Sequence, residues 1–273
     1  MLKNEHAKNH GQRNHPLFLL CSLAVVVVIT TIFAVAASSM HESKKDRLSV
    51  DDPRPVALAA ETLEQKYGWI VTYEDPPYAH ESDLVDVTEK VRRDLDKYKP
   101  GQAPKVFVPK GGSLELEYDV DPITEKPVAA DVVIQQLLDT YAINEKAGVF
   151  RMEKDGQRLH IIGVLAKNQN GALTAHQSVF ETVITLPPQK RNGLKLLEDF
   201  CAVVSQSSGT PVLIGTAPMS LFSRYETEAG AKDQKARTFL VNEFDRMTGQ
   251  ARLSWRLFYS AQMKTYFLNI HVV

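Results

Sequence analysis

Two adjacent carboxylates lie between aromatic residues after the first β-rich run of this 273-residue chain. The segment reads Tyr73-Glu74-Asp75-Pro76-Pro77-Tyr78. Paired carboxylates beside aromatic rings could bind a polar ligand or act as a general acid and base. The plainer interpretation is that a strand ends, two prolines turn the chain and the acids are solvated. The candidate contacts to a ligand or partner are Tyr73, Glu74, Asp75, Tyr78, Asp83 and Asp86.

The remaining chemistry-bearing residues form no recognisable motif. The sequence contains no HExxH, nucleophile elbow, P-loop or GxGxxG motif, and its later histidines lack metal-ligand spacing. Asp119-Val120-Asp121 resembles the start of a calcium loop, but Ile123 occupies the next ligand position. Cys201 lies in an apolar helical pattern and is interpreted as a small hydrophobic residue. We predict no catalytic residue, metal or cofactor, and the sequence favours a non-enzymatic protein.

The charge balance excludes one class of partner. The chain has 32 Lys and Arg against 33 Asp and Glu, a formal net charge of −1. Without a basic excess, nucleic acid is not expected as a partner. Of the two cysteines, Cys21 lies in the apolar N-terminal run and Cys201 in the body, so the body has no second cysteine for an internal disulfide. Export without a disulfide is typical of a bacterial envelope protein rather than a small secreted scaffold.

A continuous apolar run near the N-terminus indicates a membrane segment. Residues 16–37 carry no charge, and a helix of this length spans about 30 Å of hydrocarbon. We predict a single-pass inner-membrane anchor, with 1–15 as a cytoplasmic tail, 38–52 as a flexible stalk and the body in the periplasm or outside the cell. The alternative is a signal peptide cleaved at the small-residue site Ala34-Val35-Ala36, giving a soluble exported protein.

Four junctions between helical and β-rich patterns organise the remaining chain. An apolar helical pattern ends at or just before Gly68, Gly148, Gly209 and Gly249, and a β-rich run follows each. Glycine is favoured after a helix because it lacks the Cβ that clashes at positive φ. The corresponding predicted helices, from apolar residues every three to four positions, cover 56–67, 128–141, 194–204 and 236–247.

These junctions fall into two pairs and predict a duplicated α+β architecture. We expect two βαββαββ-like modules, residues 53–166 and 172–273, with helices packed on one face of small mixed sheets. The first module contains an insert, 75–112, and a connection of this length often carries function. In the second module we predict a strand over 179–186 that stops at two prolines, and a further strand over 221–225.

The first module resembles the secretin and TonB short N-terminal domain. The resemblance rests on Pro55-Val56-Ala57-Leu58-Ala59-Ala60-Glu61-Thr62-Leu63 followed by Tyr67-Gly68-Trp69-Ile70-Val71-Thr72-Tyr73. It continues in Leu137-Leu138-Asp139-Thr140-Tyr141 and in Gly148 followed by Val149-Phe150-Arg151-Met152. It covers 47–163 and, more loosely, 178–273, whereas the insert departs from the family pattern. The resemblance implies a periplasmic βαββαββ contact module and no active site.

Two functional hypotheses follow. The first is a non-enzymatic, membrane-tethered envelope protein whose modules bind another protein or envelope component, for example by strand addition at a sheet edge. The apolar terminal strand, residues 266–273, is one predicted edge. The second is a small-ligand-binding protein or hydrolase that uses the acidic and aromatic segment 73–86. The sequence does not predict an oligomeric state.

Overall fold

The computed structural model describes residues 44–127, 129–143, 147–247, 249 and 251–273. Lys44–Val273 forms one compact unit. Within these described residues no helix has the length and apolar character needed to cross a membrane. The predicted tail 1–15, membrane segment 16–37 and Ala34-Val35-Ala36 cleavage site lie outside the described residues.

The N-terminal half of this unit contains two helices and five strands outside the insert. In chain order they are β1 (Lys44–Asp52), α2 (Pro55–Tyr67), β2 (Ile70–Glu74), β5 (Gly112–Val120), α4 (Ala130–Ile143), β6 (Val149–Asp155) and β7 (Arg158–Lys167). The insert between β2 and β5 contributes β3 (Leu84–Asp86), α3 (Thr88–Val91) and β4 (Phe107–Pro109).

The C-terminal half repeats this order of elements. They are β9 (Val183–Asn192), α5 (Gly193–Ser208), β10 (Val212–Ile214), β11 (Glu226–Lys235), α7 (Ala236–Arg246), β12 (Leu253–Ser260) and β13 (Thr265–Val272). Two short elements have no counterpart in this scheme: β8 (Leu173–Ala175), which pairs with the end of β7, and α6 (Met219–Arg224), which lies between β10 and β11.

Strand pairings are also repeated between the halves. β1 pairs with β5 and β9 pairs with β11, both antiparallel, to give two two-stranded ribbons. β2 pairs in parallel with β7, as β10 does with β13. β6 and β7 form an antiparallel hairpin, as do β12 and β13. The fold is therefore α+β with mixed sheets, and the order of elements and pairings is the same in both halves.

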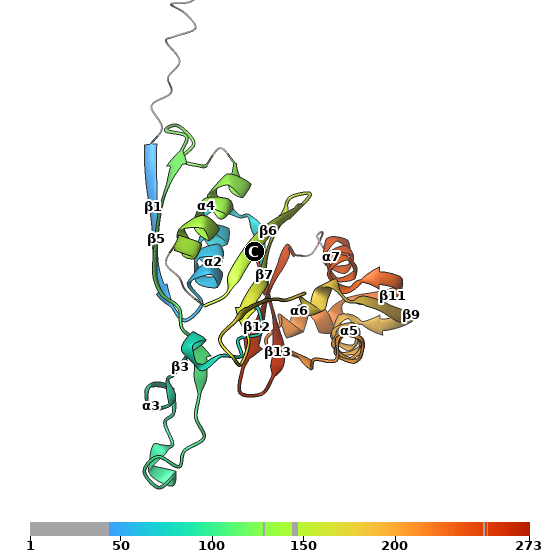
Figure 1. The fold of residues 1–273 in the computed structure, drawn as a ribbon. Helices are drawn as coiled ribbons and strands as arrows, with labels where there is room; N and C mark the ends of the chain where they lie inside the picture. Colours follow the sequence, from blue (N-terminus) through green and yellow to red (C-terminus); the bar gives the residue numbers. More distant parts are fainter. Residues whose placement is uncertain (1–43, 128, 144–146, 248, 250) are drawn as a thin grey trace, which may run out of the picture. The chain divides into compact units, whose positions relative to one another are not determined.

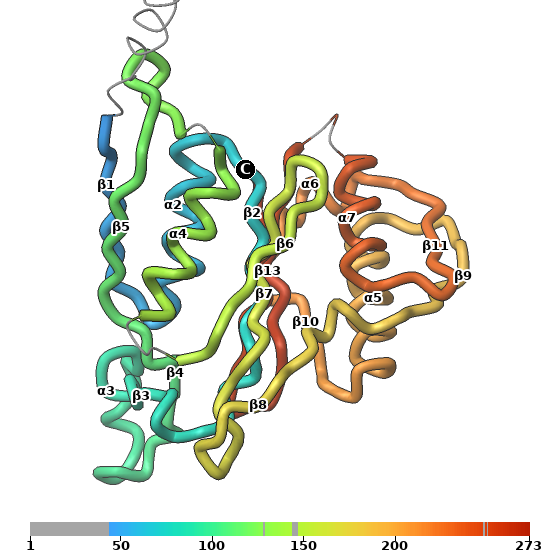
Figure 2. The backbone as a smooth tube through the Cα atoms, turned by 45° about the horizontal axis from the view of Figure 1, so that its top comes forward, coloured from blue at the N-terminus to red at the C-terminus, as the bar shows by residue number. Residues whose placement is uncertain are grey.

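The two halves share one central sheet. Its strand order is β10-β13-β12-β2-β7-β6, because β12 of the C-terminal half pairs in parallel with β2 of the N-terminal half. α2 and α4 lie between the β1–β5 ribbon and one face of this sheet, and α5 and α7 lie between the other ribbon and the opposite face (Figures 1 and 2). The helices of each half thus cover one face of their own strands, as predicted, while the covering ribbons were not predicted.

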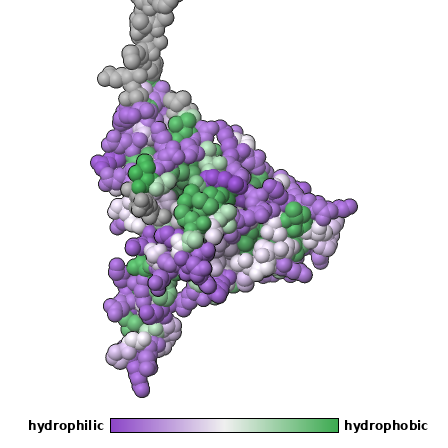
Figure 3. Space-filling model, viewed as in Figure 1, coloured by the Kyte–Doolittle hydropathy of each residue, from purple (hydrophilic) through white to green (hydrophobic). Residues whose placement is uncertain are grey.

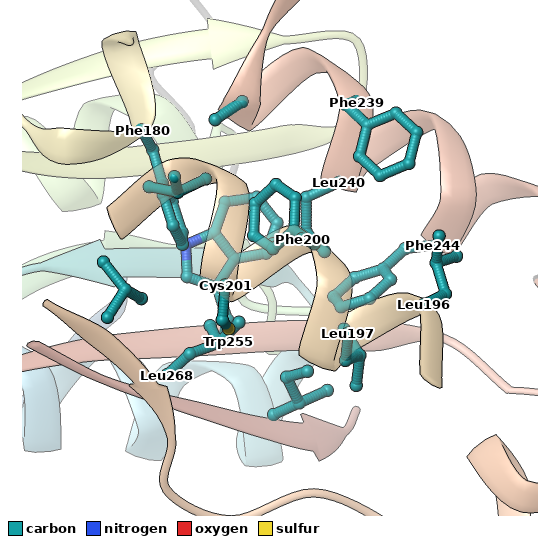
Figure 4. Close-up of a cluster of buried hydrophobic side chains, with 14 of the residues drawn as sticks. Phe180, Leu196, Leu197, Phe200, Cys201, Phe239, Leu240, Phe244, Trp255 and Leu268 are labelled. Carbon is teal, nitrogen blue, oxygen red and sulfur yellow. The ribbon is translucent and has the colours of Figure 1, made fainter. Parts of the chain in front are cut away.

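Each half has its own apolar core between helices and sheet. The N-terminal core contains Leu63 of α2, Leu137 of α4 and Val71 and Tyr73 of β2. In the C-terminal core, Phe200 of α5 and Phe244 of α7 lie in one cluster with Trp255 of β12 (Figure 4). Because strand side chains alternate between faces, the residues between these core positions point toward the other half.

Two of the four glycines predicted to end a helix do so in the left-handed conformation. Gly68 follows α2 with φ 68°, and its N–H donates to the Glu64 carbonyl oxygen at 2.7 Å. Gly209 follows α5 with φ 71°, and its N–H donates to the Ser205 carbonyl oxygen at 3.0 Å. α4 and α7 end at Ile143 and Arg246, before Gly148 and Gly249.

The predicted flexible stalk 38–52 is wrong for residues 44–52. These residues form β1, which pairs along its whole length with β5. Leu48 and Val50 are buried against the helices, while Lys45 and Arg47 form cross-strand ion pairs on the outer face. The polar, mixed-charge composition that suggested a stalk is instead that of a strand with one exposed face.

Two strand predictions in the C-terminal half also need correction. Residues 179–181 form a 3₁₀ turn, and β9 then continues through Pro187 and Pro188 to Asn192. The prolines are accommodated because the register with β11 shifts between Ala229 and Ala231, which is where a sheet tolerates residues without an N–H. Residues 221–225 do not extend the sheet, because 219–224 form α6.

The terminal strand predicted as a free edge lies inside the central sheet. β13 pairs with β12 on one side and, over residues 266–268, with β10 on the other. Further main-chain bonds from Gly215 and to Thr216 extend that contact. The edges of the central sheet are β10 and β6. Deleting 266–273 would therefore remove core side chains rather than a docking edge.

Candidate functional site

The six predicted site residues are spread along the end of β2 and the beginning of the insert. Tyr73, Glu74, Asp75 and Tyr78 are each at most 2% exposed. Asp83 is also buried, whereas Asp86 is exposed in β3. Four of the six therefore lie close together in the interior, where the alternation of strand side chains sends Glu74 and Asp75 to different partners.

Glu74 forms a bidentate ion pair with Arg237, the second residue of α7. The Arg237 Nε and Nη2 atoms donate to the two carboxylate oxygens at 2.9 and 2.8 Å, and the Ser178 hydroxyl donates to Oε2. Arg237 also pairs with Glu181. Burial opposes the charge on Glu181, but hydrogen bonds from Lys235 and Arg237 outweigh it and hold its pKa at about 2. The Glu74–Arg237 ion pair therefore connects β2 of the N-terminal half to α7 of the C-terminal half.

Asp75 accepts hydrogen bonds from four groups of the same chain. Oδ1 accepts from the hydroxyls of Tyr73 at 2.7 Å and Tyr78 at 3.4 Å. Oδ2 accepts from Arg54 Nε at 2.7 Å and from the Tyr259 backbone N–H at 2.8 Å. Burial, followed by the charge of Asp75, raises the pKa of both tyrosine hydroxyls well above its usual value. The carboxylate thus binds the start of α2 to the end of β12.

Asp83 and Asp86 lie further along the insert and have different partners from this interior group. Asp83 Oδ1 accepts from Lys167 Nζ at 2.8 Å, and its second oxygen has no hydrogen-bond partner among the residues that the structure describes. Asp86 accepts from the Thr88 backbone N–H at 2.9 Å and from the Thr88 hydroxyl, and lies 3.5 Å from Lys105 Nζ. These hydrogen bonds hold the pKa of Asp86 below its usual value. Asp86 therefore stabilises the turn into α3.

A third buried ion pair was not predicted from the sequence. Glu64 of α2 pairs with Arg256 of β12, and His271 Nε2 of β13 lies 2.9 Å from Glu64 Oε2. The other Glu64 oxygen accepts from the Val71 backbone N–H at 2.7 Å. Burial opposes ionisation of Glu64, but His271 and Arg256 outweigh it and keep the pKa below its usual value. The sequence contained one indication of this ion pair, because the charged Arg256 interrupts the apolar strand Trp255-Arg256-Leu257.

The aromatic residues of the β12–β13 hairpin and the cysteine of α5 lie in or beside the C-terminal core. Trp255 and Tyr266 are almost fully buried, and Tyr259 packs partly buried beside them. Burial raises the pKa of the Cys201 thiol to about 12, so the thiol is protonated at neutral pH. Within the described residues no group of three or more His, Cys, Asp or Glu side chains is placed to hold a metal.

His160 makes the central sheet sensitive to acid. Its ring is 2% exposed, lies against Trp255, and has Nδ1 2.7 Å from the Thr72 hydroxyl. Burial lowers its pKa from 6.5 to about 4. The unfolded chain therefore binds a proton that the folded chain does not between these two values, so stability falls as pH decreases from about 6.5 to about 4.

We expect this histidine to remove about 3 kcal/mol of stability over that pH range. Urea unfolding of the wild type and of His160→Gln at pH 7 and pH 4 measures the contribution. The loss on acidification should be smaller in the variant by about that amount, since other acid-sensitive groups are common to both proteins. Equal losses in the two proteins would show that His160 is not the responsible group.

Comparison of the chain with models of protein families, with curated proteins and with solved structures gave no match.

Proposed function

We propose that this chain is a non-enzymatic, membrane-tethered envelope protein that binds another protein through its insert. The supporting observation is that the insert places apolar side chains on the surface outside both cores. Val85, Val91 and Phe107 are 42%, 56% and 37% exposed. The insert extends away from the central sheet (Figure 1), and the corresponding connection between β10 and β11 is shorter and contains α6.

Phe107 also lines a concavity beside the β12–β13 turn. This hollow has a volume of about 280 Å³, and its walls include Leu84 and Phe107 of the insert and Tyr259 and Lys264 of the hairpin. Much of the surface seen in Figure 3 is hydrophilic, so apolar groups at such a hollow are suited to receive an apolar side chain of a partner. The predicted membrane segment 16–37 and the resemblance to a periplasmic contact module agree with a partner in the envelope.

The ligand-binding or hydrolase alternative has less support from the described side chains. It requires Glu74 or Asp75 to offer a carboxylate oxygen to a ligand. Glu74 is held by Arg237 and Ser178, and Asp75 by Arg54, two tyrosines and a backbone N–H. Such fully hydrogen-bonded buried charges are typical of structural ion pairs.

Site-specific photo-crosslinking in intact cells tests the insert as the contact surface. With a photoreactive phenylalanine analogue at Phe107 or Val91, we expect an adduct larger than the 30.5 kDa chain. The matched control places the analogue at Ile123, which is 82% exposed in the turn after β5. The triple variant Val85→Ser, Val91→Ser, Phe107→Ser should reduce adduct formation from a second reporter site in the insert at least about tenfold.

The proposal is rejected by either of two results. One is the same adduct from Ile123 as from Phe107, which would indicate random proximity in the membrane. The other is unchanged adduct formation by the triple variant with an unchanged unfolding midpoint. All three side chains lie outside the cores, so the substitutions should leave the fold intact.

A further inference from the structure

We propose that copies of this chain join head to tail through the free edges of the central sheet, with β10 of one copy pairing in parallel with β6 of the next. The junction that holds the two halves of one chain together would then be repeated between molecules. This self-association is independent of the insert and of any partner that the insert binds.

The internal junction is a short parallel pairing with little main-chain contact. β12 of the C-terminal half lies beside β2 of the N-terminal half, with Arg256 opposite Tyr73 and Leu257 opposite Glu74. The Asp75 backbone N–H donates to the Leu257 carbonyl oxygen at 2.9 Å. The two halves then cover opposite faces of the continuous sheet (Figure 2).

Strand registers identify the counterparts of these two strands. Val212 of β10 is opposite Tyr266 of β13, as Val71 of β2 is opposite Leu159 of β7, and both valines are buried core residues. The backbone N–H of each of these two valines also donates to a side chain of the preceding helix. The Ser205 hydroxyl accepts from the Val212 N–H at 2.8 Å, where Glu64 accepts from the Val71 N–H. β10 is therefore the counterpart of β2.

The same reasoning makes β6 the counterpart of β12. Met152 of β6 is opposite Ile161 of β7, and Leu257 of β12 is opposite Leu268 of β13. Arg151 then corresponds to Arg256. Among the described residues β10 pairs with β13 alone and β6 with β7 alone, so both counterparts have a free side. Each molecule thus offers one strand of each type that the internal junction uses.

An exposed apolar side chain marks the β10 edge as a surface to be covered. Leu213 is 47% exposed, whereas Thr72, the residue at the same position of β2, is fully buried beneath the C-terminal half. A second copy whose β6 lay beside β10 in the way that β12 lies beside β2 would cover Leu213. In this arrangement Arg151 of the neighbouring copy would lie opposite Ile214. The Thr216 N–H would donate to the Met152 carbonyl oxygen of the same neighbour.

The geometry determines the type of assembly. Because β10 and β6 are different surfaces, the contact is heterologous, and each copy has one of each edge still available. Repetition closes into a ring or continues as a filament, rather than stopping at a symmetric dimer. Ser205 occupies the position that Glu64 has in the internal junction. The contact between copies therefore lacks a buried ion pair and is expected to be weaker than the internal junction.

Cysteine crosslinking of the full-length chain in detergent tests this register. In a Cys21→Ser, Cys201→Ala background, one protein carries Arg151→Cys and another carries Ile214→Cys. We expect oxidation of the mixture to give a crosslinked pair, and neither protein alone to crosslink. Leu213→Cys is the matched control, because its side chain points to the opposite face of the same strand.

Mass photometry supplies an independent readout. The wild type should show species at multiples of the 30.5 kDa chain plus bound detergent. Leu213→Glu should weaken association about tenfold, while Leu173→Glu, at a leucine of β8 that is 57% exposed, should not. A monomeric wild type, crosslinking of Arg151→Cys to itself, or equal yields from Leu213→Cys and Ile214→Cys would overturn the proposal. Loss of binding to an envelope partner would leave these results unchanged.

Discussion

Replacing Arg237 with methionine is expected to lower the free energy of unfolding by about 3–5 kcal/mol. Arg237 is 6% exposed and supplies two of the three hydrogen bonds to the fully buried Glu74. Methionine occupies a similar volume but leaves the Glu74 carboxyl group buried without a charged partner and hydrogen-bonded to Ser178 alone. Urea unfolding at pH 7, followed by tryptophan fluorescence, measures the loss.

Lys235→Ala provides the matched control for this ion pair. Lys235 also pairs with Glu181, at 2.7 Å, but its side chain is 59% exposed. An exposed ion pair contributes little, so this variant should lose less than about 1 kcal/mol. Adding Glu74→Met to Arg237→Met should restore much of the lost stability, because an apolar pair replaces a buried charge. No recovery in the double variant would contradict the assignment.

Replacing Asp75 with alanine is the second change expected to be severe. It leaves the Arg54 guanidinium, the Tyr73 and Tyr78 hydroxyls and the Tyr259 N–H without their shared acceptor. Unpaired buried donors and charges each carry a desolvation cost, and together we expect a loss of about 3–5 kcal/mol. The measurement is again the free energy of unfolding in urea at neutral pH.

Asp86→Ala tests whether that loss is specific to the buried site. Asp86 is also a predicted site carboxylate, but its side chain is 37% exposed and its contacts are local ones to Thr88 and Lys105. Loss of this turn contact should cost about 1 kcal/mol. If Asp75→Ala lowers the free energy of unfolding as little as Asp86→Ala does, the contacts of Asp75 between the two halves do not stabilise the fold.

The elements predicted best from the sequence are those with strong local signals. α2, α5 and α7 follow from apolar residues every three to four positions, and two of them end at a left-handed glycine. The Asp155-Gly156 hairpin is similarly local, with β6 and β7 on either side of the turn. Each of these features is determined by residues only a few positions apart.

β11 shows why other elements were missed. Its sequence, ETEAGAKDQK, has no β-branched residue except Thr227, and within it only Ala229 and Ala231 are buried. The strand exists because β9 lies beside it and the α5–α7 layer covers one of its faces. Its conformation is decided by tertiary contacts, which override a weak β propensity.

The chemistry of the acidic and aromatic segment was decided in the same way. The sequence alone determined that two carboxylates end an apolar strand, that helices and strands alternate twice in the same order, and that an unrepeated insert separates β2 from β5. Only the tertiary structure decided that Glu74 is neutralised by Arg237, 163 residues later in the chain, and that Asp75 binds the Tyr259 N–H, 184 residues later. Periodicity and capping are local properties that a sequence displays directly, whereas burial of a charge depends on which distant residue the folded chain brings beside it.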